Sequence, residues 1–168
     1  LLALAHDMAR AVEQRHPGTV TLTLDAGFPF FDGFPLLPHL SHNDGRKLDL
    51  AFYYARRDTG DYERGGLRSP IGYWAFEAPG PRERQPCRGT AGPLRWDQAW
   101  FQPLTRSDLV LDGRRLGAAL SWLEHDGRAR RALLEAHLAD RLGADAGFVR
   151  FQGCAAARHD DHFHIELR

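Results

Sequence analysis

The sequence lacks a long hydrophobic run, an excess of either charge and nearly all lysine. No apolar stretch approaches the roughly 20 residues that a membrane-spanning helix needs, so we expect no transmembrane segment in this chain. Lys and Arg together number 22, as do Asp and Glu, and Lys47 is the only lysine. No basic run exceeds two residues. We therefore expect no surface for nucleic acid or anionic lipid.

Cysteine is also scarce. Cys87 and Cys154 are the only two cysteines and neither belongs to a C-x-x-C pair, so a cysteine zinc site or thioredoxin-type motif is not expected. The two could form one disulfide across a long loop or remain buried thiols, and export would favour the disulfide. The chain does not begin with Met, which leaves room for a signal peptide, an anchor or another domain before residue 1.

The 168 residues suit a single domain with its own core. Apolar residues at helical spacing predict helices over 1–16, 113–125 and 129–142. Alternating or continuous apolar runs predict strands over 19–25, 48–54, 147–152 and the last residues from 162. Because helices and strands do not alternate regularly, we expect an α+β fold with a small antiparallel sheet flanked by helices. His125 and His137 are expected on solvated helix faces.

The segment 56–95 is a long insertion rich in Gly, Pro, Arg and aromatic residues. Connections of this length in a compact domain usually cover or form a binding site. Its aromatic residues Tyr73, Trp74 and Phe76 could plug the core or line a substrate groove. The sequence leaves these two alternatives open.

The C-terminal segment His159-Asp-Asp-His162-Phe-His164 carries the strongest chemical signal. Side chains alternate along a strand, so His162 and His164 project from one face while Phe163 and Ile165 face a core. Two adjacent imidazoles suit a transition metal, or allow one ring to hold a metal while the other moves a proton.

A second group of polar residues lies early in the chain, where Asp49 interrupts an otherwise apolar predicted strand. An unpaired buried carboxylate is costly, and a bound cation would supply its partner. His42 precedes it, with Gly45 between them to allow a turn. Two imidazoles and a carboxylate form a ligand set of catalytic zinc sites that leave the fourth position to water. A fold that brings the early and terminal strands side by side would assemble this set.

These motifs together resemble a known family. Ser41-His42-x-x-Gly45-x-x-x-Asp49-Leu50, with His159-Asp-Asp-His162-Phe-His164, is similar to the penicillin-insensitive murein endopeptidases. The wider group of zinc peptidases includes lysostaphin-type enzymes, D-Ala-D-Ala peptidases and the hedgehog signalling domain. The C-terminal string is the more specific part, whereas residues 56–95 look unlike the family. The resemblance implies a sheet that carries one catalytic Zn²⁺ held by His42, Asp49 and His164.

The resemblance also implies roles for four other residues. His162 would be the base or transition-state stabiliser, and His159 a second catalytic histidine. His39 matches a family position that can join an accessory metal contact, and Asp112 matches an acid of that region, although Asp112 is as readily a helix N-cap. Three further acids are expected to lie in loops or to orient ligand imidazoles: Asp160, Asp161 and Glu166.

The function implied by the resemblance is zinc-dependent hydrolysis of D-Ala-containing cross-links in peptidoglycan by an endopeptidase. Such an enzyme would be periplasmic or otherwise exported. One alternative is a D,D-carboxypeptidase acting on stem peptides, and another is a non-catalytic, zinc-stabilised binding module of the same fold. The sequence does not indicate an oligomeric state.

Overall fold

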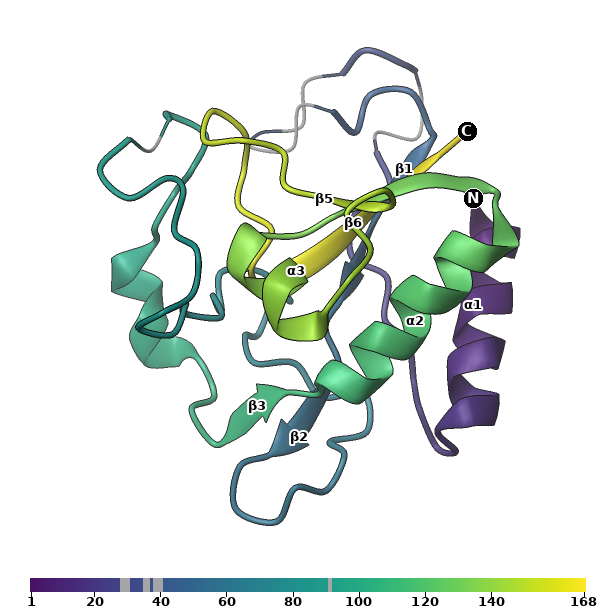
Figure 1. Cartoon of the computed structure of the whole chain (residues 1–168), viewed down its shortest axis with the longest axis horizontal. Helices are drawn as coiled ribbons and strands as arrows, with labels where there is room; N and C mark the ends of the chain where they lie inside the picture. Colours follow the sequence, from purple (N-terminus) through teal and green to yellow (C-terminus); the bar gives the residue numbers. More distant parts are fainter. Residues whose placement is uncertain (28–30, 35–36, 38–40, 91) are drawn as a thin grey trace.

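A four-stranded sheet forms the centre of the computed structural model, which describes all residues except 28–30, 35–36, 38–40 and 91 (Figure 1). The strand order is β1-β6-β4-β5. These strands are β1 (Lys47–Ala51), β6 (His162–Leu167), β4 (Ala129–Leu133) and β5 (Val149–Arg150). A separate antiparallel pair joins β2 (Tyr54–Arg56) to β3 (Leu109–Leu111). The described residues also form three α-helices around these sheets, so the expected α+β class is confirmed.

The terminal strand β6 occupies an interior position in the sheet, antiparallel to β1 on one side and to β4 on the other. In the register of β1 and β6, Asp49 lies opposite His164 and Ala51 lies opposite His162. The early and terminal strands are therefore direct neighbours. The segment predicted as a strand over 19–25 is not a named strand, but it lies beside β1 through a bridge between Thr23 and Leu50 and through backbone hydrogen bonds that join Leu22, Leu24 and Asp25 to Ala51 and Asp49.

The apolar face of β6 packs into the core. Phe163 and Ile165 are both fully buried, and burying each side chain stabilises the fold by about 1.5–3 kcal/mol. The helices α1 (Leu2–Arg15) and α2 (Gly113–Asp126) lie side by side and contribute Met8 and Leu123 to the same cluster (Figure 1). Because side chains alternate along β6, the imidazoles of its polar face point away from this cluster.

The start of α2 follows the sequence prediction closely. The Asp112 carboxylate accepts hydrogen bonds from the backbone N–H groups of Arg114 and Arg115, which caps the helix. Gly127 ends it with a φ of 78°, a left-handed conformation that favours glycine. The prediction of a helix over 113–125, with Asp112 as its N-cap, is confirmed.

The predicted helix over 129–142 is wrong in its first half. Residues Ala129–Leu133 form β4, and the helix α3 covers Ala136–Leu142 alone. Pairing with β6 outweighs the helical spacing of the apolar residues, and Arg131 adds an ion pair to Glu166 of β6 at 2.7 Å. His137 was expected on a solvated face but is buried, with its Nε2 atom 2.7 Å from the carbonyl oxygen of Glu77.

Two details of the predicted sheet also need correction. The predicted strand over 48–54 divides at Phe52 and Tyr53, so that Tyr54 begins β2 in the second sheet. The main sheet is not wholly antiparallel, because β4 and β5 run parallel. The short strand β5 occupies two residues of the predicted strand over 147–152.

From residue 57 to residue 98 the described residues form turns and irregular segments without a helix or a named strand. A 3-10 helix follows at Ala99–Leu104. A disulfide joins Cys87 to Cys154 across 67 positions and ties the long segment to the loop before β6. A cross-link between such distant residues restricts the unfolded chain and thereby stabilises the fold.

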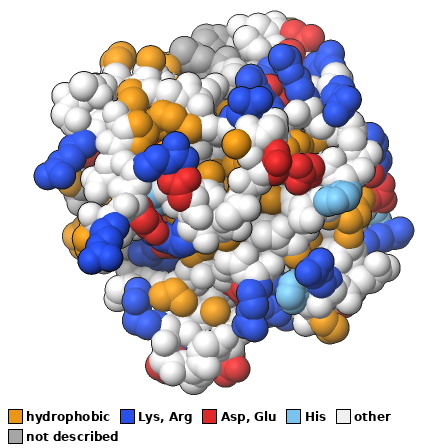
Figure 2. Space-filling model, in the orientation of Figure 1, with side chains coloured by type: hydrophobic (Ala, Val, Ile, Leu, Met, Phe, Trp, Pro, Cys, Tyr) orange, Lys and Arg blue, Asp and Glu red, His pale blue; other side chains and the backbone are white. Residues whose placement is uncertain are grey.

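Charges of both signs are scattered over the face of the molecule shown in Figure 2, and no single sign covers it. This pattern matches the equal numbers of acidic and basic residues in the sequence. Among the described residues, no helix has the length and apolar character needed to cross a bilayer.

Candidate metal centre

Three side-chain atoms converge at the junction of β1 and β6. The Nε2 atom of His42 lies 2.8 Å from Nδ1 of His164 and 3.0 Å from Oδ1 of Asp49. The same Nδ1 and Oδ1 atoms are 2.8 Å apart. Zinc binds such atoms at about 2.0–2.1 Å, so one small cation fits among them after a slight widening of the triangle. His42, Asp49 and His164 could therefore hold a metal ion.

The backbone explains how these atoms meet. Pairing of β1 with β6 places Asp49 directly opposite His164. Gly45 has a φ of 65°, in the left-handed region that glycine tolerates, and this turn carries the chain from His42 into β1. The spacing of the motif therefore has a structural reason: His42 lies in a loop, Gly45 makes the turn and Asp49 lies in β1.

The side chains of His42, Asp49 and His164 are buried. Asp49 is 0% exposed, and His42 and His164 are each 1% exposed. A carboxylate in such surroundings needs compensating charge or hydrogen bonds. A divalent cation would supply that charge, and neutral imidazoles would supply lone pairs.

Neighbouring polar groups hold the three side chains in place. Tyr73 donates its hydroxyl hydrogen to Oδ2 of Asp49 at 3.0 Å, which leaves Oδ1 directed at the two imidazoles. Nδ1 of His42 lies 3.6 Å from Oδ2 of Asp25. The hydrogen bond from Tyr73 fixes the orientation of the Asp49 carboxylate, and Asp25 places a negative charge near the ring of His42.

On the other side of the group, Nε2 of His164 lies 3.7 Å from Oε1 of Glu166. Burial lowers the pKa of His164, but its contacts with Asp49 and Glu166 outweigh burial and raise that pKa overall. The contact with His164, followed by the ion pair to Arg131, lowers the pKa of Glu166 to about 2. Glu166 is therefore an anion beside the ring of His164, and its role in orienting that ring stays a prediction.

His162 lies beside the ligand group without belonging to it. Its Nδ1 atom is bonded to Oδ1 of Asp161, and its Nε2 atom lies 3.4 Å from Oδ2 of Asp49. Burial lowers the pKa of His162, but the carboxylates of Asp49 and Asp161 outweigh burial and raise the pKa to about 9. A divalent cation bound to Asp49 would cancel much of this negative charge and bring the pKa of His162 down.

His159 lies in the same buried group of rings. Its ring centroid is 5.1 Å from that of His162 and 5.6 Å from that of His164. The structure thus brings the predicted second histidine next to the candidate centre, while its catalytic role stays a prediction. His39 lies outside the described residues. Asp112 caps α2 and pairs with Arg115, and its accessory role also stays a prediction.

The sequence did not identify Asp25 as a neighbour of the site, nor the contact that Tyr73 makes with Asp49. Tyr73 comes from the long insertion, and Asp25 from the extended segment beside β1. Tyr73 had one advance signal, its place in a long aromatic-rich insertion of the kind that often borders a site, whereas Asp25 had none. Their actual partners depend on contacts between distant segments.

We expect Tyr73→Phe to raise the Kd for zinc about 10–100-fold, the usual cost of losing an outer partner of a metal ligand. The physical reason is that Oδ2 of Asp49 loses its donor and the carboxylate is less firmly oriented. Competition with a chromophoric chelator measures the Kd. Tyr62→Phe is the matched control, because that hydroxyl bonds to the backbone of Val20 instead. An unchanged zinc Kd in Tyr73→Phe would show that the hydroxyl does not support the ligand.

Comparison with family models, curated proteins and solved structures finds no match for this chain. Its function must therefore be argued from the geometry of these residues and from the motifs they form.

Proposed function

We propose that this chain is a zinc-dependent peptidase that hydrolyses D-Ala-containing cross-link peptides of peptidoglycan. The observation that carries this proposal is the convergence of His42, Asp49 and His164 on one point, with the imidazole of His162 beside them. Two imidazoles and one carboxylate are typical ligands of catalytic zinc. The resemblance of the two motifs to murein endopeptidases supplies the substrate class.

The ligand atoms would be Nε2 of His42, Oδ1 of Asp49 and Nδ1 of His164. A zinc ion held there would supply Lewis acidity for a scissile carbonyl and lower the pKa of a bound water to about 7. Tyr73 keeps the second carboxylate oxygen of Asp49 engaged. The site thereby presents one oxygen and two nitrogens to the ion.

His162 is the base in this proposal. Its Nδ1–H donates to Asp161, so Nε2 is the nitrogen that accepts a proton. In the reaction, Nε2 would take the proton of the attacking water, and the resulting imidazolium would stabilise the developing oxyanion. As the C–N bond breaks, the imidazolium would return this proton to the departing amine, which regenerates the neutral ring. Asp161 fixes the tautomer and the ring orientation throughout.

The scheme uses no serine or cysteine nucleophile. Both cysteines are engaged in the disulfide. Penicillin acts by acylating a nucleophile, and this site offers none in the reaction, so activity should be insensitive to penicillin. The disulfide also favours an oxidising compartment, which supports an exported, periplasmic location.

The test is incubation of the purified chain with cross-linked muropeptides, with and without a chelator. We expect dimers to be split into monomers, cleavage to stop with chelator and cleavage to return with added zinc. Release of free D-Ala from monomers, with dimers intact, would instead indicate a D,D-carboxypeptidase. Unchanged muropeptides in the presence of stoichiometric bound zinc would overturn the peptidase proposal and favour a binding module.

A further inference from the structure

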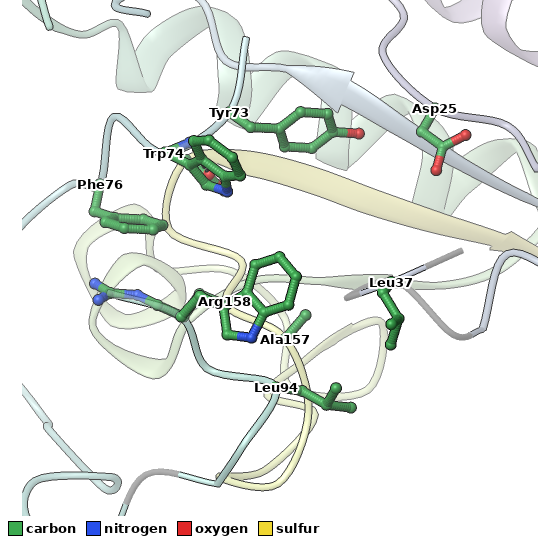
Figure 3. A pocket seen from close by; sticks show the side chains of 10 residues that line it. Asp25, Leu37, Tyr73, Trp74, Phe76, Leu94, Ala157 and Arg158 are labelled. Carbon is green, nitrogen blue, oxygen red and sulfur yellow. Dashed lines mark hydrogen bonds between the residues drawn. The ribbon is translucent and has the colours of Figure 1, made fainter. Parts of the chain in front are cut away.

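A cleft of about 250 Å³ opens beside the candidate metal centre, and aromatic residues of the long insertion form part of its wall. Tyr73, Trp74 and Phe76 are half-buried and lie along one side of the cleft (Figure 3). The sequence left open whether these three rings plug the core or line a groove, and the structure places them at the cleft. Trp96, near the end of the same irregular region, lines the cleft as well.

The aromatic surface continues past the cleft onto the 3-10 helix at Ala99–Leu104. The ring centroid of Trp100 lies 6.2 Å from that of Trp74, and Phe101 packs edge-on against both indoles. Trp100 is 69% exposed and Trp96 is 37% exposed, whereas Phe101 is buried. We call Trp74, Trp96 and Trp100 the indole surface. Contiguous exposed apolar surface of this kind, unlike a single exposed ring, is typical of a binding site.

The exposed indoles are held in place by hydrogen bonds at their polar edges. The Nε1–H of Trp100 donates to Oε1 of Gln98 at 2.6 Å, and the Nε1–H of Trp96 donates to the carbonyl oxygen of Pro93 at 3.1 Å. Both N–H groups are therefore used within the protein. What the two indoles offer to an occupant is the flat face of the ring.

The backbone that supports the indole surface is strained at two points. Among the described non-glycine residues, Trp74 and Gln98 alone have a positive φ, of 68° and 45°. Such conformations cost free energy, persist where the surroundings enforce them and cluster at ligand sites. Here Asp161 accepts from the backbone N–H of Trp74, and Gln102 donates to its carbonyl oxygen at 2.7 Å. Because Asp161 is also bonded to His162, the indole surface is joined to the proposed base.

From these contacts we infer that the indole surface binds the sugar rings of the glycan strand to which the stem peptide of peptidoglycan is attached. This assignment rests on the proposed peptidase function, because a stem peptide in the cleft brings its own glycan with it. A few residues separate the sugar from the scissile bond, and each spans at most about 3.3–3.6 Å. A glycan can therefore reach a surface that begins at Trp74 in the cleft wall and extends to Trp100.

The chemistry of a sugar ring matches this surface. A pyranose presents a face of C–H groups, which packs on the electron-rich face of an indole and leaves water as it does so. Its hydroxyl groups lie around the edge of the ring and need hydrogen-bonding partners nearby. The exposed carboxylate of Asp97 and the side-chain amide of Gln98 follow Trp96 directly in the chain and supply such partners.

A lipid bilayer is the other kind of surface that exposed tryptophans suit, but the charges beside the indoles do not favour it. Peripheral binding to anionic lipid draws on basic side chains that are free to meet the headgroups. Arg95 precedes Trp96 but is buried in an ion pair with Glu135. Asp97, which follows Trp96, is an exposed acid that an anionic surface would repel. The saccharide is therefore the favoured occupant.

The first test is calorimetric titration of the chain with glycan strands from which an amidase has removed the stem peptides. We expect saturable binding, and Trp100→Ala should raise the Kd about 10-fold, because it removes the most exposed face of the indole surface. Trp100→Phe retains an aromatic face and should restore most of the affinity. Leu104→Ala is the matched control, since this leucine is an exposed apolar residue of the same 3-10 helix and should leave the Kd unchanged.

The second test compares cross-linked muropeptides that carry their disaccharide with the same peptides after removal of the sugar. For the zinc-loaded chain we expect KM to be about 10-fold lower when the disaccharide is present, with a similar kcat, because the sugar contacts lie away from the reacting bond. Trp100→Ala should abolish this difference in KM and leave kcat nearly unchanged. A purely structural role of Trp100 would instead change both substrates alike, and that result would overturn the inference.

The outcomes distinguish the glycan surface from the proposed peptidase. Binding of peptide-free glycan that depends on Trp100, without hydrolysis of any muropeptide, supports the glycan surface and overturns the peptidase proposal. Hydrolysis with equal KM for the two substrates, and no binding of peptide-free glycan, supports the peptidase proposal and overturns the glycan surface. Co-sedimentation with vesicles of phosphatidylethanolamine and phosphatidylglycerol that is lost in Trp100→Ala, without glycan binding, would also overturn it and assign the indoles to lipid.

Discussion

His162→Ala should retain one zinc per chain and lose about 10²–10⁴-fold in kcat, the usual contribution of a general base. The reason is that Nε2 of His162 faces Oδ2 of Asp49 rather than the point where the three ligand atoms converge. Removing the ring removes the proton acceptor and leaves the ligand set complete. Metal analysis after dialysis and kcat on cross-linked muropeptides are the two measurements.

The control for this variant is His125→Ala, which removes an exposed imidazole from the end of α2. It should keep both zinc and activity. If the His162→Ala protein contains no zinc after dialysis, His162 is a zinc ligand and not a base outside the ligand set.

Asp49→Ala is expected to weaken zinc binding by more than about 100-fold, because loss of a direct ligand exceeds the 10–100-fold cost of losing an outer partner. The variant leaves two buried imidazoles without the carboxylate that completes the site. Zinc content after dialysis and a competition titration measure the effect, and circular dichroism checks that the fold persists.

Asp58→Ala is the matched control, since Asp58 is an exposed acid whose side chain accepts from the adjacent backbone N–H of Thr59. It should bind zinc as the parent chain does. Full zinc content in Asp49→Ala would show that the carboxylate is dispensable for the metal.

Local signals in the sequence were sufficient for several elements. The N-cap at Asp112 and the apolar stripe behind it predicted α2, because capping and helical periodicity act within a few residues. The alternation of His162, Phe163 and His164 likewise predicted the two faces of β6. Such patterns predict local structure without any knowledge of distant contacts.

The segment 129–142 shows where local signals were not enough. Its apolar spacing suits a helix, yet Ala132 pairs with Ile165 and Arg131 with Glu166 across the sheet. These partners lie more than thirty residues away. Short apolar runs are ambiguous between helix and strand until their partner is known.

For the candidate site, too, the sequence predicted some residues and missed others. Residue types and spacing singled out His42, Asp49 and the pair of C-terminal histidines, and the family resemblance implied that His164 is the ligand of that pair. The supporting contacts could not be singled out, since Tyr73 meets Asp49 across 24 positions and Trp74 meets Asp161 across 87. Those contacts depend on the path of an irregular insertion, for which no periodicity exists.

The most direct test of the account is anomalous scattering at the zinc edge from crystals of the zinc-loaded chain. We expect one peak about 2.0–2.2 Å from Nε2 of His42, Oδ1 of Asp49 and Nδ1 of His164. A peak elsewhere in the molecule, or none in protein shown to contain zinc, would contradict it.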